Sequence, residues 1–284
     1  MKTVWVALAA LLLAAGPAAA DQADARALRT FEAAQHKPGR VVQHLDLGGP
    51  FATRTPWTFV AIQGPTVKGV YGPEDDEPGA IMMCLAHAGI LDCSGPSFPS
   101  AKFWPVGNWE KDIDEHHALA VKIAFARQAS RAPMLQLKTT SLPCGDGCAL
   151  ISTYLLGYDR KTDRFVGLFA NGTGRNMNER TSLIESGPLT GSVIVDLPTP
   201  DAPYGYFVTV YQPAEEGAYV QRLRYRSRTR YNDGNPLSVI DSEMPEILRR
   251  LKLWKVGDPL PQPLERPVGC NRVELRRGVE WCAP

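Results

Sequence analysis

The sequence lacks the patterns by which several common classes of protein are recognised. After residue 20, no apolar run approaches the roughly 20 residues that a membrane-spanning helix needs. There is no Gly-x-Ser-x-Gly nucleophile motif, no HExxH zinc-peptidase motif, no Cys-x-x-Cys and no glycine-rich nucleotide-binding fingerprint. The sequence therefore predicts neither a cofactor nor a metal site.

An excess of charge of one sign is lacking as well. The chain has 31 Lys and Arg against 30 Asp and Glu, a net charge of +1. Residues 1–20 contain Lys2 and no acid, so the remaining residues carry 30 charges of each sign. A neutral chain has no long-range attraction for nucleic acid or for an anionic membrane. Nucleic acid is not an expected partner, and any anion must bind to a local patch.

The N-terminus has the pattern of a cleavable signal peptide. Lys2 precedes an apolar run from Val4 to Ala15, and Ala18-Ala19-Ala20 provides the small residues that a signal peptidase requires. No cysteine follows the run, so a lipid anchor is not predicted. We expect residues 1–20 to be removed and the protein to be periplasmic or secreted, with no transmembrane segment after cleavage.

Six cysteines in an exported chain indicate disulfides rather than metal ligands. Six cysteines allow fifteen connectivities, which sequence alone does not resolve. The spacing forms three local couples, each closing a short loop: Cys84–Cys93, Cys144–Cys148 and Cys270–Cys282.

Most of the chain has the texture of an antiparallel β meander. Short runs rich in Val, Ile, Thr, Tyr and Phe alternate with turn residues, and the regular helices of a parallel sheet are absent. The predicted strands are 56–65, 132–142, 148–159, 164–172, 180–186, 191–198, 204–213 and 218–231. Residues 116–128 are compatible with a strand or a helix. The fold class is mainly β, arranged as a sandwich or propeller-like.

One amphipathic helix is predicted near the C-terminus, from Ser238 to Trp254, with Pro245 in its first turn and Asp241 or Ser242 as its cap. It is expected to pack on the sheet. Residues 21–35 are read as a short helix or a loose arm. The organisation is a signal peptide (1–20), a single β-rich domain (21–256) and a proline-rich tail ending in a cysteine-clipped loop (257–284).

The most unusual feature is a ladder of alternating arginines: Arg222, Arg224, Arg226, Arg228 and Arg230. On a strand all five would share one face, where like charges repel unless anions neutralise them. The anion could be a ligand, such as phosphate, an acidic polysaccharide or lipid headgroups, because guanidinium groups bind oxyanions well. The plainer interpretation is pairing with carboxylates on neighbouring strands or with solvent.

Two other clusters have both a functional and a plain interpretation. Asp112, Asp114, Glu115, His116 and His117 could provide a metal ligand or a base, but a polar surface segment explains them as well. The loop 171–179, with Asn176, Asn178 and Glu179, could contact a sugar or calcium, or be a structured turn. Asp233-Gly234 is read as a turn before the helix.

Several strings occur together: PW-x-F with QGP (56–65), GRNMNE (174–179), GPLTG with DAPYGYFVTV (187–210), and RYRSRTRYNDGNPLSVIDSEMPEI (224–247). In these the chain resembles a group of secreted or periplasmic bacterial proteins of unassigned function. The resemblance implies an exported location and a single shared domain, and it assigns no catalytic residue.

The sequence therefore favours an exported binding or interaction module whose arginine strand meets an anionic ligand or an envelope protein. The alternatives are a hydrolase of an envelope or external polymer, using acids such as Asp112, Asp114 or Glu179, and a structural partner in an envelope assembly.

Overall fold

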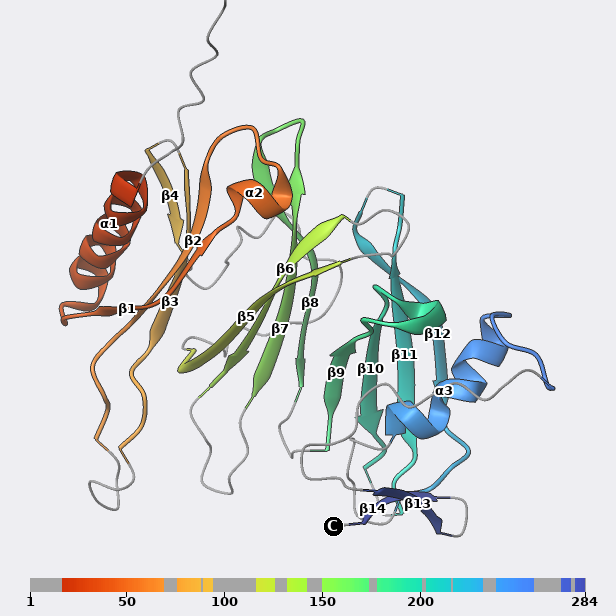
Figure 1. Ribbon diagram of the computed structural model, residues 1–284. Helices are drawn as coiled ribbons and strands as arrows, with labels where there is room; N and C mark the ends of the chain where they lie inside the picture. The colour runs from red at the N-terminus through yellow and green to blue at the C-terminus, as the bar shows by residue number, and fades with distance from the viewer. Residues whose placement is uncertain are drawn as a thin grey trace, which may run out of the picture.

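The computed structural model describes most of the chain from Pro17 onward (Figure 1). The described residues are 17–68, 76–87, 89–93, 116–125, 132–141, 150–173, 178–200, 203–215, 217–231, 239–257, 272–276 and 279–283, of which 17–21 and the last two ranges are described by their backbone alone.

The fold is mainly β, as predicted, and consists of antiparallel sheets whose strands follow one another in sequence. The first sheet contains β1 (Arg40–Asp46), β2 (Trp57–Gln63), β3 (Ile81–His87) and β4 (Ile90–Cys93). The second contains β5 (Ala118–Phe125), β6 (Pro133–Thr140), β7 (Ile151–Asp159) and β8 (Arg164–Thr173). The third contains β9 (Arg180–Leu183), β10 (Val193–Pro198), β11 (Tyr206–Pro213) and β12 (Tyr219–Arg226). A separate hairpin pairs β13 (Arg272–Arg276) with β14 (Val279–Ala283).

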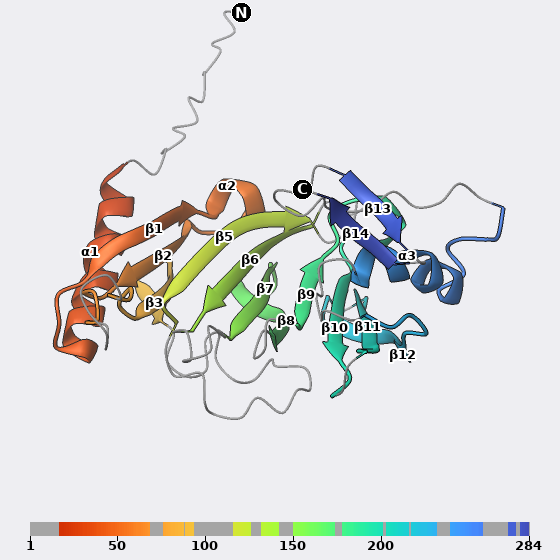
Figure 2. The same cartoon turned by 90° about the horizontal axis from the view of Figure 1, so that it is seen from below.

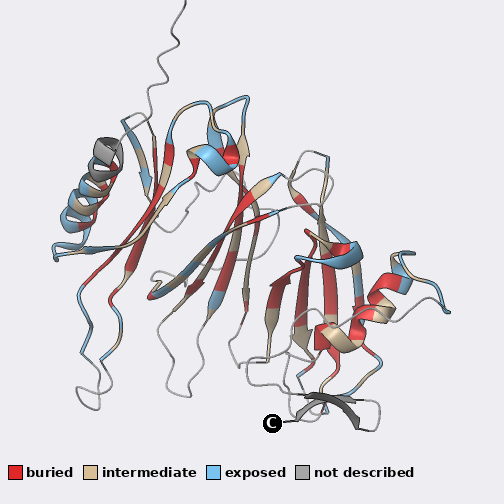
Figure 3. Ribbon diagram, viewed as in Figure 1, coloured by how far each residue is buried: buried red, intermediate tan, exposed pale blue. Residues whose placement is uncertain are grey.

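The three sheets are stacked face to face in chain order, as both views of the ribbon show (Figures 1 and 2). The middle sheet is apolar on both faces because its strands alternate between two cores. Leu135 and Leu137 of β6 pack toward the first sheet, whereas Met134 packs toward the third. Buried residues consequently run through all three layers (Figure 3). The arrangement is a sandwich extended by one further sheet.

Two helices cover the outer faces of the stack. α1 (Pro17–Gln35) lies on the first sheet and buries Ala23, Ala27 and Phe31, which recur every four residues on one face. The segment 21–35 is therefore a docked helix. Since α1 begins at Pro17, it runs through the predicted cleavage site after Ala20, but the buried contacts start at Ala23.

α3 (Val239–Arg250) covers the opposite end of the stack, and its apolar face packs on the third sheet as predicted. Its boundaries differ from the prediction. The helix ends at Arg250 rather than Trp254, and Pro245 lies inside it rather than in its first turn. Ser242 is not a cap, because its hydroxyl donates to the Val239 carbonyl one turn earlier, at 3.2 Å.

The predicted strands are confirmed, and 116–128 contains the strand β5. The strands β1, β3 and β4 and the hairpin of β13 and β14 were not predicted. β3 (IMMCLAH) is buried along nearly its whole length. A strand covered on both faces shows no polar alternation, and its Met, Leu and Ala residues do not favour a strand over a helix. A short four-residue helix, α2 (Gly48–Phe51), separates β1 from β2.

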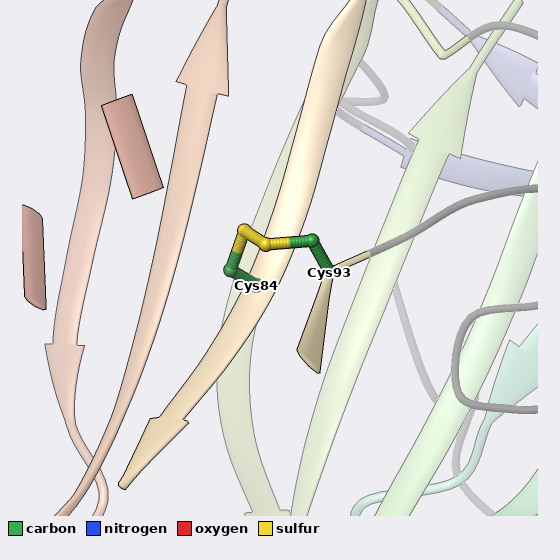
Figure 4. The surroundings of a disulfide bond; sticks show 2 residues. All are labelled: Cys84 and Cys93. Atoms are coloured by element: carbon green, nitrogen blue, oxygen red, sulfur yellow. A yellow bond between two sulfur atoms is a disulfide. The ribbon is translucent and has the colours of Figure 1, made fainter. Parts of the chain in front are cut away.

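The Cys84–Cys93 disulfide is present (Figure 4). The two cysteines are directly opposite each other in the β3–β4 hairpin, so the bond links neighbouring strands. Cys144, Cys148, Cys270 and Cys282 lie outside the residues whose side chains the structure describes, and their pairings stay predictions. Within the described part of the chain, no helix has the length and apolar character required to cross a membrane.

Candidate functional site

The arginine ladder lies on β12, which is an edge strand of the third sheet. Its geometry differs from the prediction that all five arginines share a face. The register with β11 shifts at Arg222, which lies in a bulge between Gln221 and Leu223. The strand then ends at Arg226, so Arg228 and Arg230 lie in the segment that follows it.

The bulge has a visible consequence for the side chains of β12. Tyr219 packs toward the second sheet, whereas Tyr225 packs toward α3, although six positions separate them. In a regular strand two residues an even number of positions apart share a face. Only Arg224 and Arg226, opposite Thr209 and Phe207, therefore form a regular pair on one face of the strand.

All five arginines are exposed, and none lies within ion-pair distance of a carboxylate among the described residues. The Arg224 guanidinium lies 5.6 Å from the centre of the Phe207 ring, a cation–π contact that leaves its charge uncompensated. Pairing by carboxylates of neighbouring strands is thus not found within this part of the chain.

Two of the guanidinium groups converge over Gly205. A Cβ atom built on this glycine would lie 3.0 Å from Arg230 Nη1 and 3.3 Å from Arg226 Nε. The two nitrogens are therefore no more than 6.3 Å apart. Gly205 is itself buried, although the arginines that approach it are exposed. Two cations at this separation repel each other, so the site favours an anion.

The backbone around Gly205 holds this arrangement in place. Gly205 donates its N–H to Thr199 Oγ1 at 2.9 Å, and its carbonyl accepts from the Thr199 N–H. On the other side, Ser227 exchanges hydrogen bonds with the Tyr206 backbone, and Tyr204 pairs with Tyr231. The segment after β12 is thereby fixed beside Gly205, with Arg226 and Arg230 at its two ends.

The arginines of α3 contrast with those of β12. Glu246 accepts hydrogen bonds from Arg249 and Arg250, each at 2.7 Å. These contacts lower the pKa of Glu246 to about 2, with the Arg249 hydrogen bond as the largest cause. Arg250 also lies 4.3 Å from the centre of the Tyr225 ring. The helix thus neutralises its own cations, and the β12 edge does not.

Polar side chains are buried between α3 and the third sheet, to which β12 belongs. Tyr225 donates to Glu243 at 2.9 Å, and Tyr231 bonds to Ser242. Burial raises the pKa of the Glu243 carboxyl, and it also raises the pKa of both tyrosines. These contacts attach α3 to the strand that carries the arginines.

Asp196 of β10 faces the same interface and is fully buried. Neither of its carboxylate oxygens has a hydrogen-bond partner among the described residues. Loss of hydration raises the pKa of this carboxyl well above its usual value, although the charge of Arg180 on β9 opposes the shift. Sequence reasoning missed Asp196, because nothing in the pattern VIVDLP marks the aspartate as buried.

A second polar cluster that sequence reasoning missed lies where the β7–β8 turn meets the first sheet. Asp163, with a left-handed φ of 52°, accepts hydrogen bonds from Tyr158, Thr55 and Trp57. The Tyr158 hydrogen bond is the largest cause of the lowered pKa of Asp163. Thr55 Oγ1 also contacts His87 Nδ1 at 3.1 Å. Because Thr55 and Trp57 lie more than a hundred positions before Asp163, local sequence could not reveal these contacts.

The predicted histidine cluster is only partly within the described residues. Asp112, Asp114 and Glu115 lie outside them. The His117 ring bonds to the Pro78 carbonyl at 2.7 Å, whereas the His116 ring packs edge-on against Tyr154. Burial lowers the pKa of His116 to about 4, so its imidazole is neutral at pH 7. Among the described residues, no group of three or more potential ligands could hold a metal ion.

The glycine-rich loop is also only partly described. Asn171 of β8 donates to Thr181 Oγ1 of β9 at 2.7 Å, so it joins the second sheet to the third. Asn176 and the Asp233-Gly234 turn lie outside the described residues. Asn178 and Glu179 immediately precede β9, and the charge of Glu179 contributes to the raised pKa of Asp196.

Comparison with protein families, with curated proteins and with solved structures finds no match to this chain.

Proposed function

We propose that this protein is an exported binding module that holds an anionic polymer along the β12 edge. One observation carries the proposal: the arginines of this edge are exposed without a carboxylate partner among the described residues, and two of them converge over Gly205. A protein gains no stability from an array of uncompensated like charges, whereas a polyanion could neutralise them on binding.

The spacing of the arginines favours a ligand with several charges over a single small anion. Strand residues rise about 3.3 Å each, so Arg222 and Arg226 are separated by roughly 13 Å along β12. Side chains that begin this far apart need not converge on one anion. A repeating polyanion, such as an acidic polysaccharide, can present one charge to each.

Export is supported by the signal-peptide pattern of residues 1–20 and by the Cys84–Cys93 disulfide, a bond typical of oxidising compartments. An anionic polymer of the cell envelope or of the surroundings is the ligand that such a location offers.

The proposal is tested by retention on a dextran sulfate column. We expect the wild-type protein to bind at low salt and Arg224→Ala with Arg226→Ala to elute at lower salt. The slope of log affinity against log salt should fall by about one for each arginine removed.

Arg160→Ala with Lys161→Ala is the matched control, because both residues are exposed in the β7–β8 turn and their loss removes the same two positive charges. Elution of the wild-type protein without retention, or an equal effect of the control, would refute the proposal. Binding to phosphatidylglycerol vesicles in place of the polymer would point to a membrane ligand instead.

The hydrolase alternative rests on the two acids near the start of the third sheet, Asp196 and Glu179. Burial raises the pKa of the Asp196 carboxyl, and a carboxyl that keeps its proton is what a general acid requires. Asp196, however, has no exposed surface through which a polymer could reach it. Release of new reducing ends from an acidic polysaccharide, lost in Asp196→Asn, would favour the enzyme.

A further inference from the structure

We propose that Gly205, Arg226 and Arg230 form a seat for a phosphoryl group. Gly205 lies at the base of this site, and the two guanidinium groups border it. Arg230 Nη1 and Arg226 Nε lie 3.0 Å and 3.3 Å from the point where a side chain would begin at position 205. This inference rests on the proposed function, because the seat would be the point at which the polymer is anchored.

The seat depends on a residue without a side chain. Gly205 has no positive φ, so its backbone conformation does not require glycine. Its hydrogen bonds with Thr199 use only the backbone and would also form with another residue. What glycine provides here is space: a Cβ at position 205 would lie against both guanidinium groups, 3.0 Å from Arg230 Nη1 and 3.3 Å from Arg226 Nε.

The charge of the seat identifies the class of ligand. Two guanidinium groups carry a charge of +2, and a phosphomonoester carries about −1.5 to −2 at pH 7. Its three terminal oxygens can accept from both arginines at once, in the charge-assisted bonds that arginine forms with phosphate. A carboxylate brings half that charge and two oxygens. The seat therefore favours a phosphomonoester or inorganic phosphate over a carboxylate.

Titration with inorganic phosphate, glucose 6-phosphate and glucuronate at constant ionic strength tests the proposal. We expect saturable binding of the two phosphates, with a shift of the Arg226 Nε–H resonance, and at least about 10-fold weaker binding of glucuronate. Binding should strengthen between pH 5 and pH 7, because the second ionisation of the phosphate lies near pH 6.

Gly205→Val fills the seat without changing any charge, and we expect it to weaken phosphate binding about 10-fold or more. Gly49→Ala is the control for adding a side chain, since a Cβ there meets no atom within 4 Å. Should Gly205→Val fail to fold, Gly205→Ala and Arg230→Gln test the same seat, each with folding checked by circular dichroism.

The outcomes separate this inference from the proposed function. Elution of Gly205→Val from dextran sulfate at a lower salt concentration than the wild-type protein, but still with retention, together with loss of phosphate binding, supports both. Equal phosphate binding by the wild-type protein and all seat variants overturns the seat and leaves the polymer proposal standing. Binding to phosphatidic acid vesicles without binding of soluble phosphates would overturn the seat in favour of a lipid surface.

Discussion

Asp196 provides a direct test of how burial shifts the pKa of a carboxyl in this protein and, through that shift, the stability of the fold. Its carboxyl lies in the interface between the third sheet and α3 with no exposed surface, and neither oxygen has a hydrogen-bond partner among the described residues. Desolvation by burial raises its pKa well above the usual value. We therefore expect the folded protein to keep the proton on Asp196 at a pH where the unfolded chain has already released it.

The sign of the effect follows from proton linkage. Between the pKa of the unfolded chain, about 3.9 for aspartate, and the raised pKa of the folded state, the folded protein binds one proton more. Folding stability from this group is therefore complete below the unfolded pKa and falls as the pH rises. The slope is about 1.4 kcal/mol per pH unit, or roughly 2.7 kcal/mol over two units within the window.

Asp196→Asn removes the titration and keeps the shape of the side chain. We expect wild type and variant to be similarly stable near pH 3.5, and the variant to gain on the wild type as the pH rises. Urea unfolding followed by tryptophan fluorescence at several pH values measures this difference. Asp92→Asn, at an exposed position of β4, is the matched control for the loss of one carboxyl group.

A difference between Asp196→Asn and wild type that stays constant from pH 4 to pH 7 would refute the reasoning. A wild type that gains on the variant as the pH rises would mean that the carboxylate is ionised and paired in the folded protein.

Two further predictions concern the first sheet. Cys84→Ala with Cys93→Ala should lower the free energy of unfolding by about 2–3 kcal/mol, because the disulfide closes a short loop in the unfolded chain. Chemical denaturation measures this loss of stability, and a loss below about 0.5 kcal/mol would contradict the prediction. Phe31→Ala should lower the free energy of unfolding by about 3–5 kcal/mol, since the ring is buried between α1 and Ile62 and fills the space beside Gly39. Faster proteolysis within 22–35 would report the loosening of α1. An unchanged denaturation midpoint would refute the prediction.

Features with a local cause were predictable from the sequence. The strands β6 to β12 of the second and third sheets are short runs rich in Val, Ile, Thr, Tyr and Phe between turn signals, so they were predicted in the correct order, whereas the segment 116–128 that contains β5 was left open between strand and helix. The apolar face of α3 was predicted correctly from its helical periodicity, but the helix ends at Arg250 rather than Trp254, and Pro245 lies inside it rather than in its first turn. A proline is tolerated inside this helix because packing on the third sheet outweighs the lost hydrogen bond. The Cys84–Cys93 bond was predictable because its two cysteines are only nine positions apart in the sequence.

The sequence alone thus predicted the β meander, the C-terminal helix, the local disulfide and an arginine-rich strand. It could not predict which arginines meet, because that depends on tertiary contacts. A bulge at Arg222 changes which face of β12 the side chains before and after it occupy. Gly205, which directly precedes β11, lies against Arg226 and Arg230. Tertiary packing also decided that Asp196 is buried. Register and burial depend on residues distant in sequence, so the spacing along one strand could not reveal them.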